Sequence, residues 1–171
     1  TVERNKTTPA AASHWFGELY NKSPYDFIHD RFVNDPSLPI QHGIFYFDET
    51  YPDSHTLADG EYLRKTYDPD FLLIHPSFID TSGHLYGGDS KEYRNAARIA
   101  DEALAYHLPK WLKEGYQVII TADHGRNKDA THGGNLPEET SVPLFIFGSE
   151  HTTLKNQTIQ QTDICPIICQ L

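Results

Sequence analysis

The sequence predicts an α/β protein built on a mostly parallel sheet flanked by helices. Short apolar runs typical of strands alternate along the chain with longer segments whose apolar residues recur at helical spacing. A helix in the connection between two strands favours their parallel arrangement. With 171 residues, 38% of them hydrophobic and 22% charged, the chain is long enough for one domain with its own core. We therefore expect residues 1–171 to form a single α/β domain.

The first elements follow from local composition. Small residues at 8–13 predict a strand, and residues 15–53 are expected to form an excursion or cap, because residues 15–40 are aromatic and interrupted by prolines. Within that segment, the bulky residues 44–47 resemble a short strand. A helix is predicted from Ser54 to Tyr67, where Pro69 follows and stops it.

The second half continues the alternation. Asp89 or Ser90 can cap a long amphipathic helix that Gly115 closes. The remaining elements predicted from apolar runs and turn residues are a strand at 71–74 leading into a polar loop, strands at 117–121 and 143–147 with a polar loop at 125–140, and a last helix from about 162. Cys165 and Cys169, four residues apart on that last helix, are expected to share a buried face.

Charge and hydropathy exclude several classes of partner. The formal net charge is −10, which opposes non-specific binding to nucleic acid and to anionic membranes. No apolar stretch approaches the roughly 18 residues that a membrane helix needs. The first residues carry no signal-peptide pattern, so a cytoplasmic location is expected.

The residues with the clearest chemistry are Asp80, His84, Asp123, His124 and His132. The first pair stands after the apolar run at 71–74 and the second after the run at 117–121. Carboxylate and imidazole groups are the ligands that zinc or manganese accepts, and the ends of parallel strands meet at one sheet edge. This placement predicts that the five side chains meet and bind divalent metal.

Four motifs in this order resemble the alkaline phosphatase superfamily and, within it, the nucleotide pyrophosphatase/phosphodiesterase-like branch. They are Ile79-Asp-Thr-Ser-Gly-His84, Thr121-Ala-Asp-His-Gly125, His132-Gly-Gly134 with Val142-Pro-Leu-Phe-Ile146 behind it, and Thr162-Asp-Ile-Cys-Pro166. The resemblance covers about residues 70 to 171 well and the first seventy only loosely.

The resemblance implies an alkaline-phosphatase-like core with two divalent cations, zinc foremost and manganese as the alternative. Asp80, His84 and His132 would hold one cation, while Asp123 and His124 would hold part of the second. The family's nucleophile and a further metal-binding aspartate have no match, so no catalytic residue is assigned. The resemblance thus implies a C-terminal portion whose N-terminal nucleophile region is missing, inactive alone unless a missing half completes it.

The function implied is that of a metal-dependent phosphoesterase, a hydrolase of the phosphodiesterase or nucleotide pyrophosphatase type acting on a phosphate ester or nucleotide. Two alternatives stay open. One is an enzyme of the same superfamily resembling phosphopentomutases or phosphonate hydrolases, and the other is a non-catalytic module stabilised by metal. The residues that bind substrate are not identified by the sequence.

Four weaker features have a structural and a functional interpretation. Thr7 or Thr8, next to Pro9, is a weak alternative for the nucleophile. Aromatic residues between 15 and 27 could stack a nucleobase but are better explained as core. Arg126 is a candidate anion contact. Glu138 and Glu139 are expected to be solvated acids, although one of them could support a ligand histidine.

Overall fold

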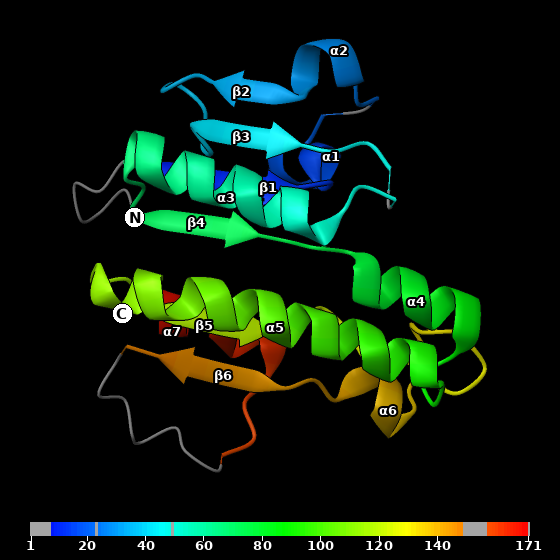
Figure 1. Cartoon of the computed structure of the whole chain (residues 1–171). Coiled ribbons are helices and arrows are strands. Elements are labelled where there is room, and N and C mark those ends of the chain that lie inside the picture. The colour runs from blue at the N-terminus through cyan, green and yellow to red at the C-terminus, as the bar shows by residue number, and fades with distance from the viewer. Residues whose placement is uncertain (1–7, 23, 49, 149–156, 171) are drawn as a thin grey trace. The chain divides into compact units, whose positions relative to one another are not determined.

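The computed structural model describes residues 8–22, 24–48, 50–148 and 157–170. The chain divides into two compact units, which adjoin in the sequence between Leu85 and Tyr86 (Figure 1). The expectation of a single domain stays a prediction.

The first unit is built on a four-stranded sheet in the order β2-β3-β1-β4. Its strands are β1 (Pro9–Ser13), β2 (Phe32–Asn34), β3 (His42–Phe45) and β4 (Phe71–Ile74). The central strand β1 is parallel to both β3 and β4, and only the edge strand β2 is antiparallel. This arrangement confirms the predicted α/β class with a mostly parallel sheet.

Alternation along β1 divides the core of this unit between the two sheet faces. Ala10 and Ala12 belong to one cluster with Leu63 of α3 (Asp53–Tyr67), whereas Ala11 belongs to the other with Phe45. Successive side chains of a strand point to opposite faces, which explains the division. Figure 1 shows α3 running along the sheet that its Leu63 covers.

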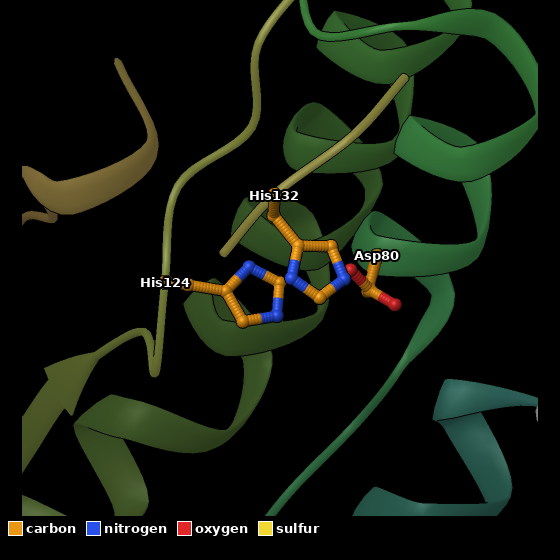
Figure 2. A group of neighbouring side chains, drawn as sticks. All are labelled: Asp80, His124 and His132. Carbon is orange, nitrogen blue, oxygen red and sulfur yellow. The ribbon is translucent and has the colours of Figure 1, made fainter. Parts of the chain in front are cut away.

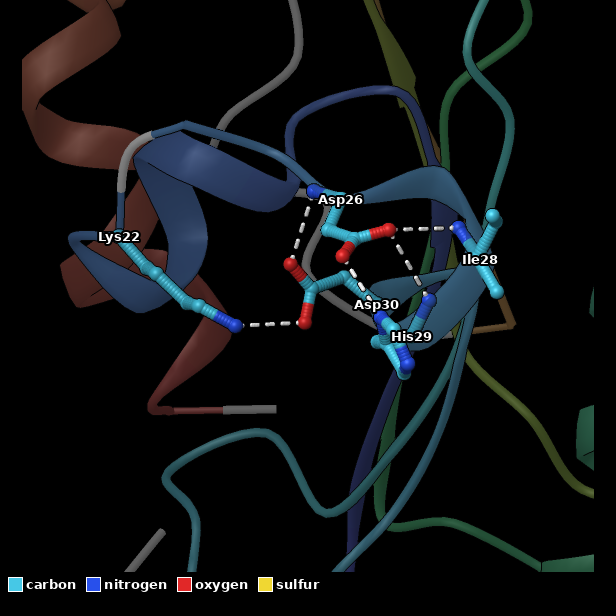
Figure 3. Close-up of polar contacts among 5 residues, drawn as sticks. All are labelled: Lys22, Asp26, Ile28, His29 and Asp30. Carbon is cyan, nitrogen blue, oxygen red and sulfur yellow. Dashed lines mark hydrogen bonds and ion pairs between the residues drawn. The ribbon is translucent and has the colours of Figure 1, made fainter.

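The segment from residue 15 to residue 40 forms α1 (Phe16–Tyr20) and α2 (Phe27–Asp30) and then returns to the sheet as β2. Asp26 begins α2, because its carboxylate accepts hydrogen bonds from the backbone N–H groups of Ile28 and His29 (Figure 3). The buried Asp30 carboxylate accepts from Lys22 Nζ at 2.6 Å and from Asp26 N–H at 3.0 Å. These contacts fix the connection from α1 to α2.

The described part of the second unit contains a long helix, two strands and three short helical segments. These are α5 (Lys91–Lys113), β5 (Val118–Thr121), α6 (Pro137–Thr140), β6 (Leu144–Phe147), η3 (Gln161–Asp163) and α7 (Ile164–Ile168). Strands β5 and β6 are antiparallel, with Val118 opposite Phe147. Of the two predicted cap candidates, Asp89 and Ser90, it is Ser90 that caps α5, since its hydroxyl oxygen accepts from Tyr93 N–H at 3.0 Å.

Four local expectations were wrong. The segment 125–140, expected to be a loop, ends in helix α6. The segment after β4, expected to be a loop, forms helix α4 (Phe78–Tyr86). The strand expected at 44–47 begins earlier, as β3. Cys165 and Cys169 are both exposed, because α7 is a short helix with no buried residue. Among the described residues, no helix is both long enough and apolar enough to cross a membrane.

Candidate metal centre

Asp80 and His84 lie one helical turn apart on α4. Their spacing of four residues places both side chains on the same helix face, with Asp80 Oδ2 and His84 Nε2 3.3 Å apart. The side chain of Asp80 is 32% exposed and that of His84 47%. Both candidate ligand groups are therefore accessible to solvent and adjacent.

The start of α4 is fixed by a residue distant in sequence. One Asp53 oxygen, Oδ1, accepts hydrogen bonds from the backbone N–H groups of Ser77 and Phe78, each at 3.1 Å. Helix N-termini leave backbone donors without intrahelical partners, and Asp53 accepts from two donors here. Burial raises the pKa of the Asp53 carboxyl, and those two hydrogen bonds oppose the rise.

Asp123 and His124 directly follow β5. The His124 Nδ1 lies 3.0 Å from the carbonyl oxygen of Gly125. Because a carbonyl only accepts, Nδ1 carries the proton and Nε2 is left with a lone pair for a metal. Gln161 Nε2 donates to the carbonyls of Ala122 and Asp123 at 2.9 and 2.8 Å, which fixes the main chain before the histidine.

His132 lies beside His124, although eight residues separate them. Their rings are nearly parallel, with centroids 3.8 Å apart and an interplanar angle of 7°. Figure 2 shows the two rings face to face and also labels Asp80, which comes from α4. The second unit thus brings together Asp123, His124 and His132, whereas α4 brings together Asp80 and His84. The union of all five in one centre stays a prediction.

This geometry fits divalent metal. Two neighbouring imidazoles, with the Asp123 carboxylate beside His124, are groups that zinc or manganese accepts as ligands. A hydrogen bond from the other ring nitrogen, as in His124, is the usual support of a metal-binding histidine.

The structure gives a structural role to two features that had a functional interpretation. Arg126 is buried and donates from Nη1 to the Ala130 carbonyl at 3.1 Å, which ties it into the loop. Phe16 lies in the core against Tyr20 and Tyr25, as expected for packing.

Thr8 stands just before β1, at the amino end of a strand parallel to β4. The α4 ligands follow the carboxyl end of β4, and the five residues of β1 span about 17 Å at roughly 3.3 Å each. This separation argues against Thr8 as the nucleophile. Thr7 lies outside the described residues.

Sequence reasoning missed most of the residues that support the candidate ligands. Glu139, for which the sequence favoured a solvated position and left a supporting role open, is buried and bonded to Asn127. No role was predicted for Asp53 or Gln161. Each forms a side-chain hydrogen bond with a residue 12 or more positions away in the sequence. The only local signal for a structural role of Glu139 was its position two residues after Pro137, where an acidic side chain can bond to the start of a helix.

Comparison with known proteins identifies a family to which the chain is similar. The family model described as type I phosphodiesterase / nucleotide pyrophosphatase matches residues 1–131 of this chain. The match includes the first seventy residues, where we expected only a loose resemblance, and stops one residue before His132. No solved structure matches the chain significantly.

Curated relatives carry related names. GPI ethanolamine phosphate transferase 1 of Neurospora crassa is 33% identical over 99 residues, which are 55% of this chain and 9% of that protein. The protein of the same name from Yarrowia lipolytica is 32% identical over 110 residues, or 61% of this chain and 12% of that protein. GPI ethanolamine phosphate transferase 2 of Schizosaccharomyces pombe is 27% identical over 124 residues, or 60% and 16%. The chain therefore spans a small part of the length of these relatives.

Proposed function

Because the chain belongs to the type I phosphodiesterase / nucleotide pyrophosphatase family, we propose that it is the metal-binding portion of an enzyme that breaks phosphoric ester bonds with two divalent cations. The proposal covers both compact units. Asp80 and His84 from α4 act together with Asp123, His124 and His132.

The observation that carries the proposal is the parallel stack of His124 on His132 at 3.8 Å. One histidine serves each cation: His132 with Asp80 and His84 on the first, and His124 with Asp123 on the second. Three aspartate or histidine ligands are a usual protein contribution to a catalytic zinc that keeps a position open. We propose zinc, with manganese as the alternative.

When bound, two such cations stabilise the charge on a phosphoryl group and lower the pKa of the attacking hydroxyl. The chain's own residues do the rest. The two aspartates provide negative charge that offsets the cations, and the histidines fix their geometry. The Gly125 carbonyl accepts from His124 Nδ1, which leaves Nε2 as the nitrogen that would bind metal.

The reaction proposed is displacement at phosphorus by a hydroxyl that has no match in this sequence. For that reason the 171-residue chain is expected to be inactive by itself. With zinc or manganese added, it should turn over aryl phosphate monoesters and diesters no faster than its His132→Ala variant. Robust turnover above that variant would contradict the proposal that the nucleophile is missing.

A second candidate concerns the acceptor. The relatives are named as ethanolamine phosphate transferases, which favours transfer of a phosphoester group to an alcohol over hydrolysis by water. Both reactions use the same centre, and a nucleophile-bearing form assayed with and without an alcohol acceptor separates them. Faster release of the leaving group with acceptor, together with a new ester product, indicates transfer. The cytoplasmic location expected from the sequence stays a prediction.

Binding of inorganic phosphate tests the metal clamp without needing turnover. The zinc-loaded chain should bind phosphate by calorimetry, and neither the zinc-free chain nor His132→Ala should do so. Zinc binding without phosphate binding would favour the module in which metal only stabilises the fold. A substrate panel, including sugar phosphates and phosphonates, separates the phosphopentomutase-like and phosphonate-hydrolase-like alternatives.

A further inference from the structure

The loop that carries His132 is held on both flanks by one buried acid, Glu139 of α6. Its side chain is 5% exposed. Glu139 Oε1 accepts from the side-chain amide of Asn127 at 2.7 Å, and Oε2 accepts from the backbone N–H of Leu136 at 3.1 Å. A buried carboxylate is costly unless its oxygens are hydrogen-bonded, so these contacts keep Glu139 in place.

Asn127 connects Glu139 to the residue just before His132. Its amide nitrogen donates to Thr131 Oγ1 at 2.6 Å, and its amide oxygen accepts from the Thr131 backbone N–H at 3.0 Å. The Asn127 backbone N–H also donates to the Thr131 carbonyl at 3.1 Å. Thr131 is therefore held by three hydrogen bonds to Asn127, two of them through its backbone, and Asn127 is bonded to Glu139.

On the other side of His132, Gly134 packs directly against Glu139. A Cβ atom at Gly134 would lie 2.3 Å from Glu139 Oε2, so only glycine fits there without displacing the carboxylate. The other histidine is reached through the backbone. The N–H of Gly125, which follows His124, donates to the Glu139 carbonyl at 2.8 Å. Through Gly125 and Gly134, Glu139 thus contacts the main chain close to both His124 and His132.

We propose that Glu139 is a positioning residue, which with Asn127 holds His124 and His132 in the stacked arrangement that the proposed metal centre uses. This inference rests on the proposed metal centre and adds to it the part of the loop that sets its geometry. Glu139 itself does not bind metal in this proposal. Its role is to keep the loop from residue 125 to residue 139 in one conformation before metal arrives, which lowers the ordering cost of binding.

The variant Glu139→Gln tests this role with almost no change in size. Glutamine offers one acceptor and one donor group where glutamate offers two acceptors. Whichever way the amide is turned, an N–H group faces either the amide donor of Asn127 or the backbone donor of Leu136. Glu138→Gln is the matched control, because Glu138 is its exposed neighbour on the same helix and loses the same charge.

The double variant Asn127→Asp/Glu139→Gln exchanges the two functional groups. Aspartate at 127 can accept from glutamine at 139 and still accept from the backbone at 129 and 131, while the glutamine oxygen accepts from Leu136. Net charge equals that of the wild type. The exchange should therefore restore the network that Glu139→Gln breaks.

The experiment measures zinc affinity by competition with a chelating dye and the visible absorption of the cobalt(II) form, which reports ligand geometry. Glu139→Gln should weaken zinc binding about tenfold or more and change the cobalt spectrum, as expected when support of ligating histidines is lost. Glu138→Gln should match the wild type, and the double variant should return to within about threefold of it. Circular dichroism of each metal-free chain checks that the variants fold.

Three results would overturn the inference. The first is zinc affinity of Glu139→Gln equal to that of Glu138→Gln. The second is a double variant as weak as Glu139→Gln, which would remove the role of the pair with Asn127. The third is lower melting of metal-free Glu139→Gln with an unchanged cobalt spectrum, which would make Glu139 merely structural. If the wild type binds no more zinc than His132→Ala, the proposed function itself fails, a result distinct from these three.

Discussion

Gly125 offers the sharpest structural test of the loop that follows β5. Replacing it with alanine puts a Cβ atom 2.1 Å from the carbonyl oxygen of Glu138 and 3.2 Å from that of Ser141. The first distance lies about 1.3 Å inside the 3.4 Å at which ordinary contact begins, and the obstacle is backbone with no side-chain rotamer to change. The chain at Gly125 must therefore move away from α6.

Two contributions determine how much Gly125→Ala lowers the free energy of unfolding. Overpacking against backbone costs up to about 3 kcal/mol. The displacement also strains the hydrogen bond from Gly125 N–H to the Glu139 carbonyl, which contributes about 1 kcal/mol. A total near 3 kcal/mol lowers the melting temperature of a chain of this length by about 6–12 °C.

The assay is thermal unfolding of the metal-free chain followed by zinc titration. Gly125→Ala should lower both the melting temperature and zinc affinity, because the displaced residue adjoins His124. Gly115→Ala is the control: its φ is +90° and nothing lies within 4 Å of the added Cβ, so it should lose about 1–2 kcal/mol from backbone strain alone and bind zinc normally. Melting of Gly125→Ala within about 1 °C of wild type would refute the reasoning.

Three further predictions concern the supports of the helices. Ser90→Ala removes the acceptor for Tyr93 N–H at the start of α5 and should cost about 1 kcal/mol in urea unfolding; a loss no larger than that of Asp89→Ala, an exposed neighbour, would contradict it. Asp53→Ala removes the acceptor at the start of α4 and should destabilise by about 1–3 kcal/mol. Asp53→Asn keeps that acceptor. Because burial raises the pKa of the Asp53 carboxyl, the charged carboxylate opposes folding at neutral pH, and Asp53→Asn should be at least as stable as the wild type at that pH. The stability advantage of Asp53→Asn should shrink as pH falls through the folded pKa of Asp53. The hydrogen bond between Asp26 and His29 raises the pKa of His29 and lowers that of Asp26. The contribution of the pair to stability is therefore lost as pH rises through the folded pKa of His29 and as pH falls through that of Asp26. An NMR titration should show a lower His29 pKa in Asp26→Asn, and an unchanged pKa would contradict the pairing.

The elements that sequence alone predicted are those with local causes. Helix α5 was predicted from its apolar spacing and from Ser90 and Gly115 at its ends, and β4 and β5 from apolar runs in front of polar residues. Helix α4 was not predicted, because the acceptor at its start is Asp53, 24 residues before Ser77. Local pattern contains no information on a cap of that kind.

The sequence identified the candidate site residues, whose union in one metal centre stays a prediction, but not most of the residues that hold them. Asp80 with His84, and Asp123 with His124 and His132, were identified from residue type and position after strands, and each set is adjacent within its own unit. The burial of Glu139 was not predicted, because it depends on a hydrogen bond with Asn127 in a loop without repeating pattern. Burial of an acid follows from its partners, and partners in loops are set by tertiary structure.

The central claim is that side chains from both units bind cations together, and metal stoichiometry tests it most directly. The chain is reconstituted with zinc, freed of loose metal, and its zinc content is measured by elemental analysis beside Asp80→Ala and His132→Ala. The wild-type chain should hold at least one zinc, and both variants, one changed on α4 and the other in the loop after β5, should show a clear loss. Zinc content in the wild type no higher than in either variant would contradict it.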